Sequence, residues 1–304
     1  AVLDYDTFIL FVMGTPRRTS ASDLKLSSDI IVEIDDLDEC DEEITSKGWK
    51  QSYWARCKLS ADQSSWFQWE FLLDWMCCLM CFIITGAIEF FAKPHVVYFK
   101  EGDFTQSYPF TPSTVPNWLL GLILVSPSVI ATTHQIILKL PDRKHIIHHV
   151  LLSWASSITL TLLVCQVIKY LCGRHRPDYF SRESQPLTPK ELRDGSLSFP
   201  SGHASGSFCA MTYLFWYISG TNKLFYRGRY SLFIVNAIPL YFALWVAITR
   251  LQNYRHDYTD VSAGIVLGLL GGTFGYFLYF KSPFGPFCGK PKNHKSLYLL
   301  SLDE

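Results

Sequence analysis

Three short polar stretches, each at the end of a strongly apolar segment, contain residue types suited to phosphate chemistry. They are Lys169 to Pro177, Pro200 to His203, and Thr249 to Asp260. Together they supply fixed cations, two imidazoles, one carboxylate and a glycine-containing turn that can open a helix. This set suits the binding of a phosphate group and the cleavage of its ester bond without a metal ion.

The cations of these stretches are predicted to hold the phosphate. Charge in a phosphoryl-transfer transition state spreads over equatorial oxygens, which fixed cations stabilise. Arginine offers planar paired donors and lysine a point charge, so Lys169, Arg176 and Arg250 form the predicted cradle. The alternative role is to anchor helix ends among lipid headgroups, but such anchoring does not require a fixed spacing.

The Pro200-Ser-Gly-His203 stretch is predicted to start a helix. Ser201 can cap that helix and Gly202 lets the backbone approach a ligand closely, so free N–H groups face an anion. An ordinary N-cap is the simpler interpretation, and it is compatible with phosphate binding. His256 and Asp260 are four residues apart, which places them on one face if the segment is helical. Asp260 can then accept from one ring nitrogen and leave the other basic.

Six apolar segments are expected to position these stretches. They lie near residues 70–92, 118–140, 146–171, 203–220, 229–249 and 260–281. Each approaches the ~20 residues that a helix needs to cross a bilayer, and backbone groups in lipid must pair internally. The sequence therefore predicts an all-α bundle of six transmembrane helices. Glycines in the last segment would permit close packing: Gly264, Gly268, Gly271, Gly272 and Gly275.

The composition limits the function classes. The chain has 304 residues, mean hydropathy of +0.14 and zero net charge, so it has no bulk basic field for nucleic acid. Nine cysteines include Cys77 and Cys81 at helical spacing, but no second Cys/His pair accompanies them, so no zinc site is predicted.

His145 and His149 are interpreted as marking the membrane interface. Asp74 and Glu89 lie within the first apolar segment, where ionisable groups are costly, but near enough to its ends to reach water.

The loop charges predict an orientation. Cations gather in the loops after the second and fourth segments and in the C-terminal tail: Lys139, Arg143, Lys144, Lys223, Arg227, Arg229, Lys281, Lys290, Lys292 and Lys295. The positive-inside rule makes that side cytosolic, with both termini there and the three polar stretches on the luminal or extracellular side. Three regions are predicted: a polar, acidic, flexible cytosolic tail (1–65), a membrane core (66–282) and a cytosolic C-terminal tail (283–304).

The three stretches resemble the motifs of the type 2 phosphatidic acid phosphatase superfamily, the lipid phosphate phosphatases. The family pattern is Lys-x6-Arg-Pro, then Pro-Ser-Gly-His, then Ser-Arg-x5-His-x3-Asp, and the resemblance covers residues 66–282. It implies that His256 is the nucleophile and forms a phosphohistidine, and that Asp260 orients it. His203 would be the general acid and then the base. No metal ion or other cofactor is implied, and the partners are a lipid phosphate and the bilayer.

Two positions depart from the family pattern. Thr249 stands where the family has Ser, and its hydroxyl predicts little effect. Asp257 follows the nucleophile where many relatives have another residue, and the sequence does not give its effect. Arg174 and His175 are treated as secondary residues near the mouth of the site, and the Pro-rich stretch around Tyr108 and Val115 as a border of the lipid access route.

Phosphatidate is the predicted substrate and a magnesium-independent hydrolase of phosphoric monoesters the predicted enzyme. Alternatives on the same pocket are a polyprenyl pyrophosphate phosphatase, a lipid phosphotransferase or a sphingoid-base phosphate phosphatase. Haloperoxidases share the constellation but are soluble. An inactive scaffold would lack catalytic residues, whereas His203, His256 and Asp260 are all present. The sequence leaves open the physiological lipid, the particular membrane and whether the chain forms a homo-oligomer.

Overall fold

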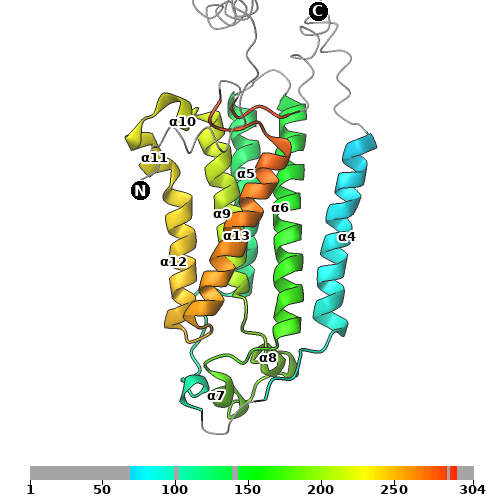
Figure 1. The fold of residues 1–304 in the computed structure, drawn as a ribbon, viewed down its shortest axis with the longest axis vertical. Coiled ribbons are helices and arrows are strands. Elements are labelled where there is room, and N and C mark those ends of the chain that lie inside the picture. The colour runs from blue at the N-terminus through cyan, green and yellow to red at the C-terminus, as the bar shows by residue number, and fades with distance from the viewer. Residues whose placement is uncertain (1–68, 99–102, 139–142, 286–287, 293–304) are drawn as a thin grey trace, which may run out of the picture. The chain divides into compact units, whose positions relative to one another are not determined.

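The computed structural model describes residues 69–98, 103–138, 143–285 and 288–292. Within these residues the regular elements are helices, and one isolated bridge joins Phe280 to Pro291. The long helices are α4 (Trp69–Phe91), α5 (Asn117–Leu138), α6 (Arg143–Cys172), α9 (Gly202–Thr221), α12 (Ile238–Gln252) and α13 (Tyr258–Tyr279). Figure 1 shows them side by side as a bundle. The all-α class predicted from the apolar segments is confirmed, while the predicted tail at 1–65 lies outside the described residues.

Helix α9 is the centre of the bundle. It packs against α5, α6, α12 and α13, and fifteen of its twenty residues are buried. By length and composition, four described helices could span a membrane, namely α4, α5, α6 and α13, and the bent pair of α11 (Tyr230–Asn236) and α12 makes a fifth. Helix α9 is not among these helices because its serines and glycines lower its hydropathy. It can carry them because it contacts protein on most sides, whereas a lipid-facing helix needs apolar side chains.

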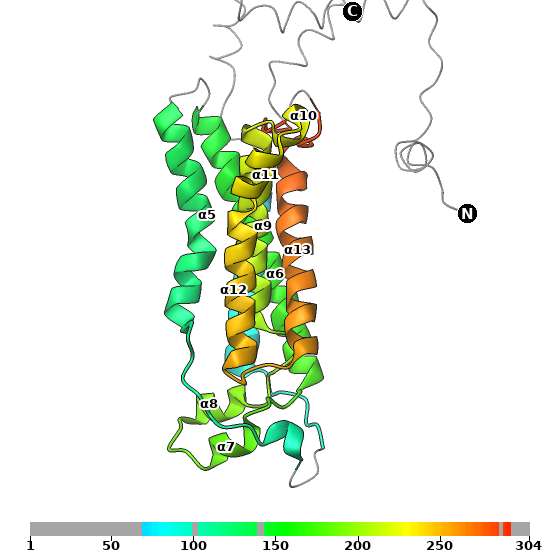
Figure 2. The same ribbon diagram turned by 90° about the vertical axis from the view of Figure 1, so that its left-hand side faces the viewer.

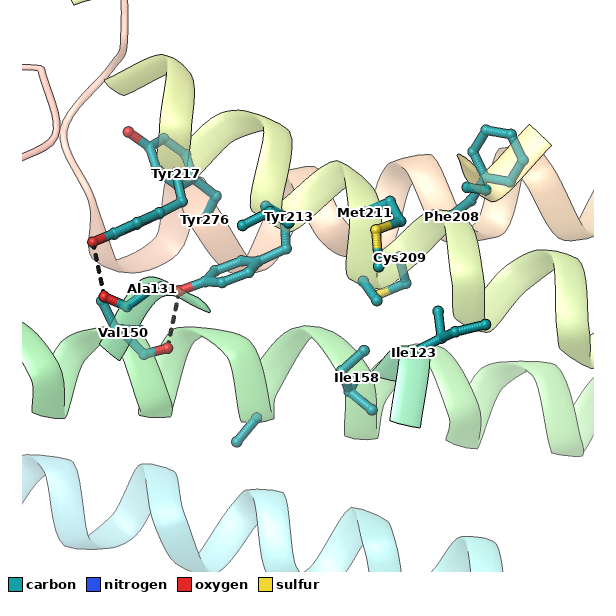
Figure 3. Close-up of a cluster of buried hydrophobic side chains, with 14 of the residues drawn as sticks. Ile123, Ala131, Val150, Ile158, Phe208, Cys209, Met211, Tyr213, Tyr217 and Tyr276 are labelled. Carbon is teal, nitrogen blue, oxygen red and sulfur yellow. Dashed lines mark hydrogen bonds between the residues drawn. The ribbon is translucent and has the colours of Figure 1, made fainter. Parts of the chain in front are cut away.

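Tyrosines of α9 satisfy polar groups inside the bundle. Figure 3 shows Tyr213 and Tyr217 reaching the neighbouring helices through their hydroxyl groups. The Tyr213 hydroxyl donates to the carbonyl of Val150 in α6 at 2.9 Å, and the Tyr217 hydroxyl donates to the carbonyl of Ala131 in α5 at 3.2 Å. Buried polar groups are costly unless they are paired, so these bonds let the central helix carry hydroxyls inside the bundle.

Helix α13 lies unusually close to α9. A Cβ added to Gly268 would sit 2.5 Å from the carbonyl oxygen of Ser205 and 2.7 Å from Cβ of Phe208. Only glycine fits such a contact, because every other residue would push the two backbones apart. The close packing predicted from the glycines of the last apolar segment is confirmed.

The fifth apolar segment is two helices rather than one. Helix α11 (Tyr230–Asn236) and α12 meet at Ala237 with a bend of 41°. Pro239 lies in the first turn of α12, where its missing N–H cannot continue the hydrogen-bond ladder of a preceding helix. The uninterrupted helix predicted over 229–249 is therefore corrected.

Short helices that the hydropathy pattern did not predict form a cap at one end of the bundle. They are α7 (Tyr179–Glu183) and α8 (Pro189–Asp194), with the 3-10 turn η2 (Phe104–Gln106) nearby; α10 (Leu224–Arg227) lies at the other end (Figures 1 and 2). Glu89 of α4 ties the cap to the bundle, since it accepts from Arg193 at 2.9 Å and from Gln166 at 2.6 Å. At the opposite end of α4, Asp74 accepts from the Tyr279 hydroxyl at 3.0 Å. Both carboxylates are thus paired.

Candidate active site

The three polar stretches meet at the cap end of the bundle. Helices α6 and α12 end there, and α9 and α13 begin there (Figures 1 and 2). Antiparallel neighbours joined by loops bring sequence-distant segments to one end of a bundle. The backbone N–H of Ser201, just before α9, donates to the carbonyl of Asp260 in α13 at 3.0 Å, so the second and third stretches are directly bonded.

A glycine turn brings the first stretch into the same place. Gly173 ends α6 at φ +57°, and its N–H donates to the Lys169 carbonyl at 3.1 Å. A Cβ at Gly173 would collide with the carbonyl oxygen of His95, so this left-handed turn requires glycine. Beyond it, two backbone hydrogen bonds of 2.8 and 2.9 Å join residues 174–176 to residues 195–198.

Lys169 lies beside the start of α9. Its Nζ donates to the carbonyls of Pro200 at 2.9 Å and Leu197 at 3.3 Å, and it is 3.8 Å from the point where a Cβ at Gly202 would lie. Ser201 is the N-cap of α9 and accepts from the Ala204 N–H, which confirms the predicted cap. The ammonium group and the free N–H groups of the helix start therefore face the same space.

The loop before α5 holds both Arg250 and His203. Arg250 is 1% exposed, and its Nη1 donates to the Ser113 hydroxyl at 2.7 Å and to the Val115 carbonyl at 3.2 Å. His203 Nε2 lies 3.0 Å from the same carbonyl oxygen. Because a carbonyl oxygen only accepts, this contact requires a hydrogen on Nε2 and leaves Nδ1 as the second functional nitrogen of His203.

His256 and Asp260 form a buried pair with Ser198. The side chains of all three are at most 4% exposed. His256 Nδ1 lies 3.4 Å from the Ser198 hydroxyl and 3.7 Å from Asp260 Oδ2, and the Ser198 hydroxyl donates to that carboxylate oxygen. Nδ1 therefore faces the carboxylate side, and Nε2 is the nitrogen directed away from it.

Two further groups hold the carboxylate of Asp260. Arg174 Nη1 donates to Oδ1 at 2.8 Å, and the Asp257 N–H donates to Oδ2 at 3.0 Å in a capping box that begins α13. Arg174 also pairs with the half-exposed Asp257 at 2.9 Å. The buried negative charge of Asp260 is thus matched by one cation and two neutral donors.

The charge of Arg176 acts on the buried histidine of this group. Burial lowers the pKa of His256 well below its ordinary value, nearby Arg176 and Lys169 lower it further, and the Asp260 contact acts in the opposite direction. The imidazole is consequently neutral at pH 7. Burial also lowers the pKa of Arg176 to about 10, which keeps it charged. Its Nε is buried without a hydrogen-bond partner among the described residues.

Comparison with known proteins gives a family. The sequence profile described as the PAP2 superfamily matches residues 150–283. A PA-phosphatase related-family protein of Dictyostelium discoideum is 36% identical over 241 residues, which cover 76% of this chain and 88% of that relative. The chain belongs to the PAP2 superfamily. This PAP2 chain is also 30% identical to diacylglycerol pyrophosphate phosphatase 1 of Saccharomyces cerevisiae, over 70% of the chain and 81% of the relative.

A plant relative of this PAP2 chain is the probable lipid phosphate phosphatase 4 of Arabidopsis thaliana, 28% identical over 71% of the chain and 76% of that protein. No solved structure matches the chain. The family profile begins in α6 and ends just after α13, so it contains all three polar stretches.

The structure brings all the predicted site residues of this PAP2 chain to one end of the bundle. They are Lys169, Arg176, Ser201, Gly202, His203, Arg250, His256 and Asp260. One local prediction was wrong: His256 lies in the loop before α13 and not on a helical face with Asp260. Asp257 is the N-cap instead, and a capping-box pattern of Asp257 with Asp260 was the signal for this boundary.

Sequence reasoning missed several groups in the site of this PAP2 chain. Ser198 and Ser113 carry the hydroxyls described above, and Val115 contributes only its backbone carbonyl, which no side-chain pattern reveals. Arg174 contacts Asp260 directly instead of standing at the mouth. His175 points into the cap, where its Nε2 meets the Val97 carbonyl at 3.1 Å.

The two departures from the family pattern have visible contacts. The Thr249 hydroxyl accepts from Arg250 Nη2 at 2.9 Å and donates to the Val246 carbonyl at 2.6 Å. The hydroxyl that Thr shares with Ser therefore braces the arginine. Asp257 caps α13 and pairs with Arg174. No group of three His, Cys, Asp or Glu side chains suited to a metal ion occurs among the described residues.

Proposed function

We propose that this chain is an integral-membrane lipid phosphate phosphohydrolase that converts phosphatidate to diacylglycerol through a phosphohistidine. The observation that carries the proposal is the arrangement around His256. Its Nδ1 faces Ser198 and Asp260, and Lys169 and Arg176 lie near enough for their positive charges to lower its pKa. A neutral imidazole beside fixed cations suits attack on a bound phosphate.

The cradle consists of Lys169, Arg176 and Arg250, together with the N–H groups at the start of α9. All three cations lie near enough to His203 for their charges to act on its ring. Fixed charges in a site with little water stabilise the equatorial oxygens of the transition state without reorganisation. Arg250 is held by Thr249, Ser113 and Val115, which supports a preorganised contact.

In the first step, Nε2 of His256 attacks phosphorus and the bond from phosphorus to the lipid oxygen breaks. The phosphatidate monoanion passes its proton to Nδ1 of the neutral His203 ring as it binds, and His203 gives this proton to the departing oxygen, which leaves as the alcohol group of diacylglycerol. Its Nε2–H remains on the Val115 carbonyl, so that contact orients the ring during transfer. The phosphorylated His256 ring becomes positively charged, and the Asp260 carboxylate stabilises it.

In the second step, water attacks the phosphohistidine. His203 accepts a proton from the water at Nδ1, the new oxygen–phosphorus bond forms, and the bond from phosphorus to Nε2 breaks. Inorganic phosphate leaves with the proton that His203 took from the water, His256 regains its lone pair, and the His203 ring is neutral again. Each step needs only groups that the chain supplies, together with water.

The names of the relatives support a lipid substrate. They include lipid phosphate phosphatases and diacylglycerol pyrophosphate phosphatases. Large apolar side chains of α4 and α12 are exposed, among them Phe82, Ile83, Tyr241 and Trp245, as expected of helices that face lipid. Acyl chains can remain in the bilayer while the headgroup reaches the cap end.

The first test is phosphate release by the purified protein. We expect release from phosphatidate in excess EDTA at a rate within about twofold of that in magnesium, because cations of the protein occupy the place that a metal would take. Polyprenyl pyrophosphate, sphingosine 1-phosphate and diacylglycerol pyrophosphate form the comparison panel. Strict dependence on a divalent ion would contradict the cradle, and a preference for polyprenyl pyrophosphate would replace the substrate assignment.

The orientation is part of the proposal. Cations at the end opposite the cap include Arg143, Lys144, Lys223 and Arg229. The positive-inside rule places that end in the cytosol, which puts the cap and the site on the luminal or extracellular side. Cations at the cap end such as Lys169, Arg174 and Arg193 are accounted for by the polar contacts of the site and the cap.

An inserted glycosylation acceptor tests this orientation. The sequence has no native Asn-x-Ser/Thr, so there is no background signal. We expect an Asn-Gly-Thr inserted after the exposed Gln185 of the cap to be glycosylated in cells, because acceptors are modified on the luminal side. The matched control is the same insertion after exposed Asn222, near α10. Modification of the control alone, seen as a glycosidase-sensitive mass shift, would invert the assignment.

A further inference from the structure

The carboxylate of Asp260 meets the ring of His256 only in a long contact, and the Ser198 hydroxyl lies closer to the same nitrogen. The 3.7 Å between Nδ1 and Oδ2 exceeds a hydrogen bond, although orienting the nucleophile is the task of this carboxylate in the proposed reaction. Ser198 fills the gap. Its hydroxyl is 3.4 Å from Nδ1 and donates to Oδ2, and no other hydrogen-bond partner of Nδ1 is found among the described residues.

We propose that Ser198 is the positioning residue that fixes the tautomer of His256, which rests on His256 being the nucleophile. A hydroxyl has a single hydrogen, and Ser198 uses it on a carboxylate oxygen that can only accept. The oxygen of Ser198 therefore presents a lone pair to Nδ1, and Nδ1 must carry the hydrogen. Nε2 is then unprotonated and available for attack.

The competing partners of Asp260 support this assignment. Oδ1 is taken by Arg174 at 2.8 Å, and Oδ2 accepts from the Asp257 N–H as well as from Ser198. The ionised carboxylate accepts three hydrogen bonds and has no hydrogen to donate. It therefore cannot turn toward the ring without breaking a buried hydrogen bond. The orientation of His256 is therefore transmitted through the serine.

Ser198 is itself held in place on both sides. Its N–H donates to the Arg174 carbonyl at 2.9 Å, and Lys169 binds the flanking carbonyls of Leu197 and Pro200. The segment is fully buried at Leu197 and Ser198, so solvent water does not replace the hydroxyl. The first stretch of the site thus fixes the residue that orients the nucleophile of the third.

The tautomer can be read directly from ¹⁵N spectra of histidine-labelled protein, in which protonated and unprotonated ring nitrogens resonate in separate ranges. His256 is assigned by its absence in His256→Gln. At neutral pH we expect a hydrogen on Nδ1 in the wild type and a mixture of both tautomers in Ser198→Ala. A hydrogen on Nε2 in the wild type, or one unchanged tautomer in Ser198→Ala, would overturn the proposal.

Kinetics provide a second readout. We expect Ser198→Ala to lower kcat about 10- to 100-fold, as loss of an orienting partner does elsewhere, with KM within about threefold. Ser198→Thr should recover most of kcat because it restores the hydroxyl. Ser196→Ala is the matched control, since the Ser196 hydroxyl lies at the same 3.4 Å from Nδ1 of His175, outside the site. A kcat for Ser198→Ala within twofold of the control would refute the role.

The two measurements separate this inference from the proposed function. If wild-type protein releases phosphate from phosphatidate and traps a phosphohistidine, the function stands whatever Ser198→Ala does. If the wild type is inactive but the tautomer shifts as expected, the positioning role stands and the substrate assignment fails. A folded Ser198→Ala protein is expected, because the change removes one oxygen and adds no volume.

Discussion

Replacement of His256 with alanine is expected to lower kcat for phosphate release by about 10⁵-fold or more, because it removes the atom that bonds to phosphorus in the proposed reaction. Loss of a nucleophile or its base costs this much in comparable covalent mechanisms. The side chain is 4% exposed and lies in a loop, so the protein should still insert and fold. Initial rates and thermal melting of the purified variant measure the two effects separately.

Trapping of the intermediate makes the His256 test specific. The wild type is quenched with alkali during turnover of ³²P-labelled substrate, because phosphohistidine is labile in acid. We expect the label to remain on the wild type and to be absent from His256→Ala. His95→Ala is the matched control, because His95 is an exposed histidine at the same end of the bundle. Near wild-type turnover by His256→Ala would remove the nucleophile assignment.

Asp260→Asn is expected to lower kcat by about 10³- to 10⁴-fold while KM stays within about threefold. A neutral amide cannot stabilise the positive charge on the phosphorylated ring, and similar losses follow when an orienting aspartate becomes asparagine in other catalytic groups. Its NH₂ group would also meet the donors of Ser198 or Arg174. The cations of the cradle are unchanged, so inhibition by vanadate, a phosphate mimic, should persist at similar concentrations.

Asp257→Asn is the matched control for this second prediction. Asp257 also pairs with Arg174, but its side chain is 44% exposed, and Asn is a good N-cap. We expect it to lose less than about tenfold in kcat. Equal loss of turnover and of vanadate binding in Asp260→Asn would show that Asp260 shapes the anion pocket instead of orienting His256.

The sequence predicted that the candidate site residues would gather at one end of the bundle, because charged residues are placed at the ends of apolar helices and not inside them. The spacing from Lys169 to Arg176 and from Arg250 to Asp260 is visible in the printed chain, and antiparallel helices bring those ends together. The central position of α9 was less visible, since a helix enclosed by protein carries serine and glycine and weakens its own hydropathy signal.

The contacts that orient the side chains were beyond sequence reasoning. Val115 acts through a carbonyl oxygen, which every residue possesses, and Ser198 is one of many serines until its neighbours are known. Pro239 and the Asp257–Asp260 capping box were legible signals for the helix break and for the start of α13. The continuous apolar run around Pro239 favoured one unbroken helix instead. The four-residue spacing of His256 and Asp260 favoured a helix that included both residues.

The glycine contact between α13 and α9 makes the candidate site sensitive to substitutions that lie far from it. Gly268 lies two turns along α13 from Asp260, against Ser205 and Phe208, and the same two helices are bonded at Ser201 and Asp260. A methyl group at Gly268 would push α9 and α13 apart in the interior of the bundle. Displacements near 1 Å can lower a reaction rate a hundredfold. The close contact at Gly268 therefore helps to keep the candidate site residues at the ends of α9 and α13 in alignment.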